Sequence, residues 1–247
     1  VATPSGISLA PEGGAHQSSI TAGIGIETPG IDYFEPTFAV ELEWILLDAI
    51  ARLARPGPAA GIYLRLSTVP VDQRLFPAHR PDLRQQVLQG GYRLIDRRQE
   101  PEYEPEENVV HLFAMGVMVP EVMEASEALR ARGILANVFS LTAPGRIYAD
   151  FARVRRGFRQ GQPTEESWLE RLLEPRERRA PIVTVADASS HALSFIGSAF
   201  GGRSIALGVD TFGESGSRWD LYRKAGIDRD TIAGAAETAL VDLDSYP

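Results

Sequence analysis

The chain has 247 residues, 44% of them hydrophobic, and a formal net charge of −8 at pH 7. This length suits one large or two small domains, and the apolar fraction is enough for a sizeable core. An acidic chain has no general attraction for phosphate backbones or anionic lipid, so we expect neither nucleic acid nor a membrane as a partner. Cysteine is absent, which excludes disulfides, thiolate metal sites and cysteine nucleophiles.

The compartment is predicted from what the sequence lacks. No apolar run approaches the ~20 residues that a membrane helix needs. We expect no signal peptide at the start, and a chain of this length without disulfides fits the cytoplasm. Val1 stands where an initiator Met would be expected, so a processed terminus and the interior of a longer gene product both remain open.

The start of the chain is expected to form strand, loop and strand. Gly6–Ala10 is short, apolar and partly β-branched, which is typical of a strand. Pro11–Ser18 is rich in glycine and is predicted to be a loop. Ile24–Pro29 is predicted to be a second short strand.

A long helix is predicted next. Glu35-Pro36-Thr37 is a helix start with proline in the first turn, and apolar residues recur at helical spacing from Phe38 to Leu53. Gly61–Ser67 is then a strand. Residues 71–107 are rich in Pro, Arg and Glu, and we interpret them as an interdomain connection with one strand at Gly91–Ile95. The acidic run at its end is expected to be a solvated surface, not a metal site.

From residue 108 strands and helices alternate regularly. Such alternation indicates βαβ crossovers and a mainly parallel sheet covered on both faces, so the fold class is α/β. The predicted strands are 109–115, 136–141, 181–186 and 203–209, and the predicted helices are 120–132, 146–159, 165–173, 190–200 and 228–241.

Three segments carry a family resemblance. Glu12–Ser18 has an acidic-Gly-x-x-His pattern, Tyr63–Thr68 follows as an apolar strand, and Leu207–Arg218 contains Gly-x-Asp-x-Phe-Gly. In this order they resemble the C-terminal part of thiamine-diphosphate-dependent transketolases and homodimeric pyruvate dehydrogenase decarboxylating subunits. Trp168–Leu173 is more similar to the dehydrogenase subunit than to transketolase.

The resemblance implies a domain organisation. Residues 1–70 would be the C-terminal part of a thiamine pyrimidine-binding domain, 71–107 the connection, and 108–247 a complete transketolase C-terminal-like domain. The family's Gly-Asp-Gly…Asn motif for diphosphate and metal does not occur, and its catalytic Glu would precede residue 1. Thiamine diphosphate with Mg²⁺ would therefore be held mainly by regions absent from this chain.

The implied activity needs a partner. The first candidate is the decarboxylating component of a 2-oxo acid (pyruvate-type) dehydrogenase, which passes an acyl group to a lipoyl acyltransferase. The alternatives are a transketolase-type two-carbon ketol transferase and a non-catalytic assembly or dimerisation subunit or fragment. The expected partners are further copies of this chain, a companion chain carrying the N-terminal domain, or both.

The candidate site residues follow from the same motifs. His16 is the catalytic candidate, since the family's matching His reaches the reacting carbon and the substrate oxygens; a loop histidine bonded to backbone is the alternative. Glu12 and Gln17 join His16 as cofactor-binding candidates, against the alternative of polar loop residues. Ser18 departs from the transketolase Gln-Pro pattern. Arg65 is the substrate-binding candidate, with a structural ion pair as the alternative.

Other polar residues are expected to be structural. Asp187 and Asp210 follow strands at the sheet edge where ligands bind in open α/β folds. The family's C-terminal domain binds no cofactor, however, so we interpret Phe212-Gly213 as turn and packing residues. His111 in a strand and His191 at a helix start lack metal partners at ligand spacing, and both are expected to be satisfied structural histidines.

Overall fold

The computed structural model of the chain describes residues 6–57 and 60–241. Residues 1–5, at the start of the first predicted domain, and 242–247, at the end of the second, lie outside the described residues. No helix in the described ranges is long and apolar enough to cross a membrane.

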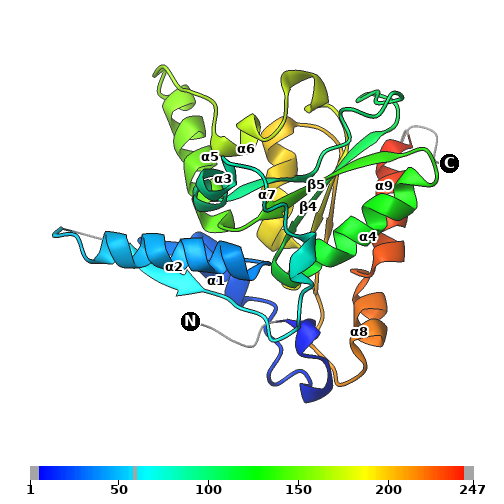
Figure 1. Cartoon of the computed structure of the whole chain (residues 1–247), viewed down its shortest axis with the longest axis horizontal. Coiled ribbons are helices and arrows are strands. Elements are labelled where there is room, and N and C mark those ends of the chain that lie inside the picture. Colours follow the sequence, from blue (N-terminus) through cyan, green and yellow to red (C-terminus); the bar gives the residue numbers. More distant parts are fainter. Residues whose placement is uncertain (1–5, 58–59, 242–247) are drawn as a thin grey trace.

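A five-stranded sheet forms the centre of the molecule (Figure 1). Its strand order is β3-β5-β4-β6-β7; β3 runs antiparallel to β5, and the other neighbours are parallel. This confirms the predicted α/β class with a mainly parallel sheet. The strands are β3 (Gly91–Ile95), β4 (Val109–Met115), β5 (Leu135–Leu141), β6 (Ile182–Val185) and β7 (Ser204–Leu207).

Helices cover both faces of this sheet because successive side chains point to opposite faces. Val110 and Leu112 pack in one apolar cluster with α4 (Val119–Arg130) and α9 (Arg229–Leu240). Phe113 and Met115 pack in a second cluster on the other face. The helices of that second face are α5 (Pro144–Arg159), α6 (Trp168–Arg171) and α7 (His191–Phe200).

The N-terminal unit, residues 6–67, projects from this body (Figure 1). Its two parallel strands, β1 (Ile31–Phe34) and β2 (Gly61–Leu64), pair with each other. Two helices, α1 (Thr21–Glu27) and α2 (Ala39–Leu53), accompany them. The helix predicted from Phe38 is therefore confirmed as α2, and β2 lies within the predicted Gly61–Ser67 strand.

The strand predicted at Ile24–Pro29 is wrong, because these residues mostly belong to helix α1. A Cβ on Gly25 would lie 2.6 Å from the Tyr33 ring, so the helix packs onto β1 through a residue without a side chain. Ile24, whose apolar side chain suggested a strand, is 53% exposed. Small residues on the buried face hide the helical periodicity from a hydrophobicity pattern.

The strand predicted at Gly6–Ala10 is also wrong; Ile7–Glu12 form the 3₁₀-helix η1. The backbone N–H groups of Ile7 and Ser8 donate to the side chain of Asp187, and not to a neighbouring strand. Ala10 within η1 has φ 49°, a conformation that residues with a Cβ rarely adopt.

Residues 71–107 contain more structure than a connection. They form η2 (Gln73–Leu75), helix α3 (Leu83–Gln89) and strand β3, which has the predicted bounds. Because β3 joins the central sheet, the C-terminal unit includes residues that precede 108. Four further elements were not predicted: β1, η3 (Gly116–Met118), η4 (Pro175–Glu177) and α8 (Arg218–Ala225).

Candidate functional site

Two glycine-rich loops that are far apart in sequence meet below the central sheet (Figure 1). We call residues 12–18 the His16 loop and residues 208–217 the C-terminal loop. The Nε2 atom of Gln17 donates to the carbonyl oxygens of Ala10 at 3.2 Å and Glu214 at 2.9 Å. Two of the three segments that carry the sequence motifs are thus in direct contact.

Glycines allow this close approach. A Cβ on Gly14 would lie 2.2 Å from the carbonyl oxygen of Gly213, and a Cβ on Gly13 would lie 2.6 Å from Oγ of Ser215. A Cβ on Gly213 would lie 1.9 Å from Oε1 of Gln17. These distances are all below normal contact, so a side chain at Gly14 would clash with backbone, and one at Gly13 or Gly213 would displace the side chain of Ser215 or Gln17.

His16 lies at the surface of this junction. Its side chain is exposed, and its backbone N–H donates to the carbonyl of Gly13 at 3.1 Å. Glu12 is exposed as well, and within the described residues no hydrogen bond joins it to His16. His16 is therefore accessible at the surface of this chain. The cofactor-binding and catalytic roles of Glu12, His16 and Gln17 remain predictions.

Arg65 lies beneath the His16 loop in a buried network. Its side chain is 1% exposed, and its Nη1 atom pairs with Oε1 of Glu35 at 2.6 Å. Its Nη2 atom donates to the carbonyl of Asp187 at 2.7 Å, and Nε donates to Oγ1 of Thr21 at 3.2 Å. The hydroxyl of Tyr33 donates to the other oxygen of Glu35.

The electrostatics of this network follow from burial and charge. Burial opposes the charged form of Arg65, but the neighbouring charges, Glu35 above all, raise the pKa of its guanidinium above the usual value. Burial, reinforced by the Glu35 charge, raises the pKa of Tyr33. The structural ion pair considered for Arg65 is therefore present. A substrate contact by Arg65 would compete with these bonds, and that role remains a prediction.

Asp187 joins the two units. It follows β6 at the carboxyl end of the sheet and is fully buried. Its carboxylate accepts hydrogen bonds from the backbone N–H of Ile7 at 2.7 Å and of Ser8 at 3.1 Å. Burial raises the pKa of Asp187, although the Arg65 charge and these N–H donors act against that effect. The backbone N–H of Ser189 donates to the carbonyl of Ser19 at 2.8 Å.

These contacts were invisible in the sequence. An arginine between apolar strand residues signals a buried acidic partner, but nothing in the pattern identifies that partner as Glu35. Asp210 accepts from the backbone N–H of Ser190 at 2.9 Å, beside the start of α7. It therefore serves the packing of the C-terminal loop.

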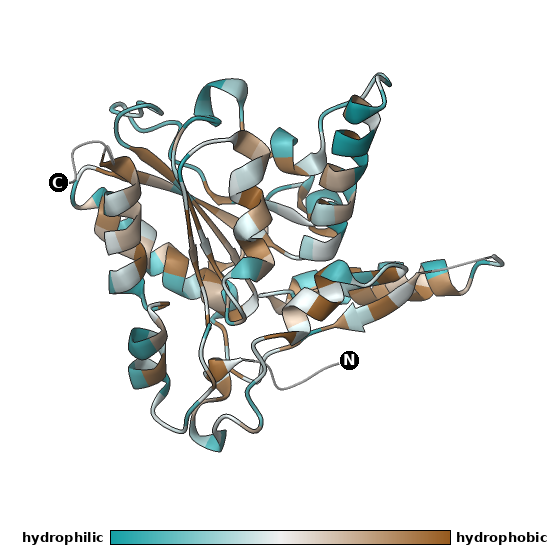
Figure 2. Ribbon diagram, turned by 180° about the vertical axis from the view of Figure 1, so that it is seen from behind, coloured by the Kyte–Doolittle hydropathy of each residue, from teal (hydrophilic) through white to brown (hydrophobic). Residues whose placement is uncertain are grey.

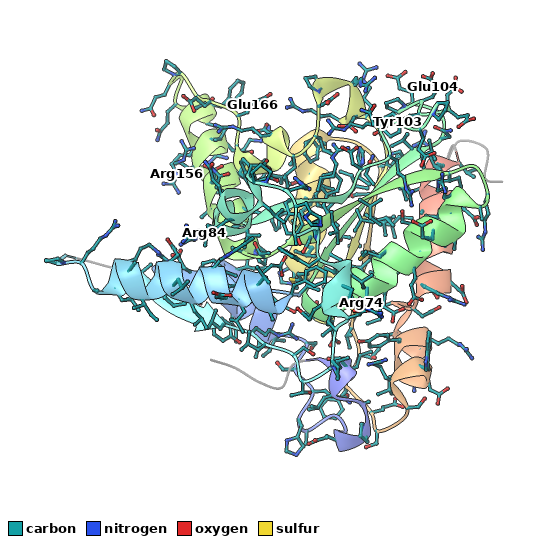
Figure 3. All side chains as sticks on the ribbon, in the orientation of Figure 1. Arg74, Arg84, Tyr103, Glu104, Arg156 and Glu166 are labelled. Atoms are coloured by element: carbon teal, nitrogen blue, oxygen red, sulfur yellow. The ribbon has the colours of Figure 1, made fainter. Side chains whose placement is uncertain are left out.

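A second polar cluster surrounds His111. Its Nε2 atom lies 3.0 Å from the carbonyl of Glu177, and its Nδ1 atom lies 3.3 Å from the amide nitrogen of Asn137. Burial lowers the pKa of His111 to about 4. The Glu177 carboxylate accepts from Arg93 at 2.6 Å and from Tyr103, which Figure 3 labels at the edge of the molecule. The structural interpretation of His111 is confirmed.

Three other features of the described residues bear on a possible site: metal-ligating clusters, an apolar cavity and the exposed His191. No group of three His, Asp or Glu side chains in the described ranges could hold a metal ion. A cavity of about 210 Å³ lies beyond the carboxyl ends of β1 and β2, lined mainly by apolar side chains such as Phe38, Leu42, Leu66 and Val117. His191 is exposed and pairs with Glu27 at 3.0 Å, which links α7 to α1.

Comparisons with known proteins agree on one family. A family model described as "Transketolase-like TK C-terminal domain" matches residues 90–228. The chain is 27% identical over 235 residues to the pyruvate dehydrogenase E1 component of Pseudomonas aeruginosa, covering 94% of this chain and 26% of that protein. It is 27% identical over 240 residues to the chromosomal transketolase of Cupriavidus necator, covering 97% and 30%.

Solved structures show the same fold. An H261F mutant of the Pichia stipitis transketolase has a TM-score of 0.68 at 20% identity and covers 97% of this chain and 29% of that one. A structure titled "Split gene transketolase, inactive beta4 tetramer" has a TM-score of 0.61 at 18% identity and covers 97% of this chain and 64% of that one. The chain thus spans about a quarter of the length of the curated pyruvate dehydrogenase relatives.

Proposed function

Because the chain belongs to the transketolase-like family through its C-terminal domain, we propose that it is part of a thiamine-diphosphate-dependent enzyme. The proposed activity is that of a 2-oxo acid (pyruvate-type) dehydrogenase decarboxylating component. The observation that carries the proposal is the His16 loop, which is packed against the C-terminal loop while His16 itself is exposed. The similarity to three pyruvate dehydrogenase E1 components supports the choice of substrate class.

His16 would act on the substrate. Imidazole can donate, accept or carry charge near neutral pH, so it can hydrogen-bond a substrate oxygen on which negative charge develops. Thiamine diphosphate, when bound, supplies the chemistry of carbon–carbon cleavage next to a carbonyl. The described residues lack a cluster of metal-ligating side chains. Among the described residues, His16 could contact the reacting end of the cofactor, but no group of side chains suits the Mg²⁺-diphosphate end.

The diphosphate and metal would therefore be held by a companion chain or by preceding sequence. An exposed apolar face on the N-terminal unit supports this requirement (Figure 2). The strands β1 and β2 pair only with each other within the described residues, and an isolated pair of strands is marginally stable. The face comprises Leu46, Leu47, Ile50 and Leu53 of α2, which are 39% to 64% exposed. Ile24 and Ile31 are also exposed, on the α1 side of the β1–β2 pair.

The partners proposed for this enzyme are a companion carrying the N-terminal domain, further copies of this chain, and a lipoyl acyltransferase as the acyl acceptor. A structurally similar protein is described as a split-gene transketolase in an inactive β4 tetramer, which supports the proposal of a companion chain. The proposed compartment is the cytoplasm.

Calorimetry tests the cofactor requirement. Thiamine diphosphate with Mg²⁺ is titrated into the full chain alone and into the chain mixed with the product of a neighbouring gene that carries the diphosphate motif. We expect saturable binding only in the mixture. Absence of binding in both titrations would leave the non-catalytic assembly subunit as the better description.

Transketolase activity is the second candidate. The C. necator transketolase matches this chain over 97% of its length, at the same 27% identity as the P. aeruginosa dehydrogenase subunit. The reconstituted pair is therefore assayed with pyruvate and, separately, with a ketose phosphate and an aldose phosphate acceptor. Turnover of the sugars without turnover of pyruvate would select two-carbon ketol transfer.

A further inference from the structure

We propose that the C-terminal loop holds His16 in its working position, and that Gln17 and Gly213 are the positioning residues of this support. The inference rests on the catalytic role proposed for His16. It assigns a task to the Gly208–Arg218 motif, and it makes Gln17 a support for its neighbour instead of a cofactor ligand.

The first contact is the amide of Gln17. Its nitrogen donates to Ala10 on its own side of the junction and to Glu214 on the C-terminal loop. One side chain therefore fixes the base of the His16 loop to a segment about 200 residues away. Because Gln17 is adjacent to His16, a shift of this amide moves the backbone that carries the imidazole.

The second contact is steric. Oε1 of Gln17 is buried against Gly213, where a Cβ would lie only 1.9 Å from this oxygen and 2.9 Å from Cβ of Gln17. On the other side, Gly14 packs against the carbonyl of Gly213 and the ring of Phe212. The two loops therefore fit in one relative position.

The third contact lies at either end of the His16 loop. Asp187 accepts hydrogen bonds from Ile7 and Ser8 before the loop. Ser189 donates to the carbonyl of Ser19 after the loop. Both partners follow β6, so the C-terminal unit contacts the chain before the His16 loop, at Gln17 within it and at Ser19 after it.

The junction leaves no room for a cofactor on the inner side of Gln17. The cavity between the loops, lined by Ile7, Gln17, Val209 and Phe212 among others, measures about 40 Å³. This volume suits a few water molecules at most, whereas ligand pockets occupy roughly 300–1,000 Å³. The inner side of the His16 loop is therefore a packing surface, and ligand contact is left to the outer side.

The first test uses Gly213→Ala in the full chain, with Gly234→Ala as the matched control. Nothing lies within 4 Å of a Cβ at Gly234, which is in helix α9. We expect Gly213→Ala to speed backbone hydrogen exchange in residues 12–18 by about 10-fold or more, because the loop opens locally when its support is displaced. Unchanged exchange in the His16 loop would overturn the proposed support.

A double-mutant cycle tests whether Gln17 is the partner of Gly213. In a Gln17→Ala background Oε1 and Cδ are gone, so Gly213→Ala should perturb the loop less than it does in the wild type. Equal effects in both backgrounds would mean that the Gly213 substitution acts elsewhere.

The second test uses turnover by the chain assembled with its companion. We expect Gly213→Ala to lower kcat by about 10- to 100-fold through misplacement of His16, with thiamine diphosphate affinity unchanged. In a His16→Ala background the same substitution should lower kcat no further. Gly234→Ala should turn over like the wild type.

The outcomes separate this inference from the proposed function. If His16→Ala alone leaves kcat intact, the catalytic role of His16 fails. If His16→Ala lowers kcat and Gly213→Ala lowers it again by the same factor, His16 is catalytic, but Gly213 does not act through it, and the positioning inference is overturned.

Discussion

Arg65 is the largest fully buried side chain among the described residues. It links the two units, because it pairs with Glu35 in the N-terminal unit and donates to the carbonyl of Asp187 in the C-terminal unit. Removing one partner of a buried ion pair costs about 3–5 kcal/mol because the other charge is left unpaired. We expect this loss of unfolding free energy for Arg65→Met, measured by urea denaturation.

The Arg65→Met, Glu35→Gln double variant should recover part of the loss, because it buries no unpaired charge. Arg74→Met, which removes a surface partner of Asp72, serves as the control and should unfold like the wild type. An Arg65→Met variant as stable as this control would contradict the buried network.

His111 makes stability depend on pH. Its folded pKa of about 4 lies below the unfolded value of 6.5, so the unfolded chain takes up the proton first as pH falls. The buried neutral His111 therefore contributes fully to the free energy of unfolding above pH 6.5, and this contribution is lost as pH falls towards 4. The 2.5-unit difference corresponds to about 3 kcal/mol.

The measurement is the free energy of unfolding at several pH values between 7 and 4.5. Replacing His111 with Gln should flatten the acid-side decline. Replacing the exposed His79 with Gln should leave the decline as it is. A decline of equal steepness in wild type and His111→Gln would show that other groups cause it.

At the scale of elements, the buried carboxylate of Glu41 caps the N-terminus of helix α2. Glu41 accepts from the backbone N–H of Thr37 at 2.7 Å and of Phe38 at 2.9 Å, and from the hydroxyl of Tyr92 on β3 at 2.8 Å. Glu41→Ala leaves three buried donors unpaired, so we expect a loss of about 2–4 kcal/mol. Thermal and urea unfolding would show it.

The exposed Glu43 on the same helix provides the comparison. Glu43→Ala should change the unfolding free energy by less than about 0.5 kcal/mol. Similar losses for the two variants would mean that helix propensity, and not the cap, sets the stability of α2.

Elements could be predicted from the sequence where their own residues carry the full hydrophobic pattern of a strand or helix. Strand β4 was predicted with its observed bounds because apolar, β-branched residues fill it. Helix α1 was missed because glycines form its packing face. The 3₁₀-helix η1 was missed because the group that accepts from its backbone, the side chain of Asp187, is 180 residues away.

The site was predicted in part for the same reason. His16 and the two glycine loops are visible as motifs, but a motif does not show which other motif it touches. The contact of Gln17 with Glu214 and the burial of Arg65 both depend on the segments that follow β7 and β6.

At the scale of the whole molecule, the N-terminal unit presents the apolar face of α2. Leu47 and Ile50 on α2 are 53% and 64% exposed. Burial of such a surface drives association, so Leu47→Gln with Ile50→Gln should weaken binding to the companion or to further copies. Light scattering after gel filtration measures the change.

Phe158 on α5 is the control, since it is 73% exposed outside this face. Phe158→Gln should leave the assembly state unchanged. If the α2 variant assembles like the wild type while Phe158→Gln dissociates, the partner surface lies on α5.

His16 is proposed to belong to an active site completed by another chain. The most direct measurement is pyruvate-dependent turnover by the chain reconstituted with its companion, with wild-type chain and with His16→Ala. We predict no turnover by either chain alone, turnover by the pair, and a loss of about 100-fold or more in kcat for His16→Ala with cofactor affinity preserved. A His16→Ala pair that turns over at the wild-type rate would show that His16 has no catalytic role.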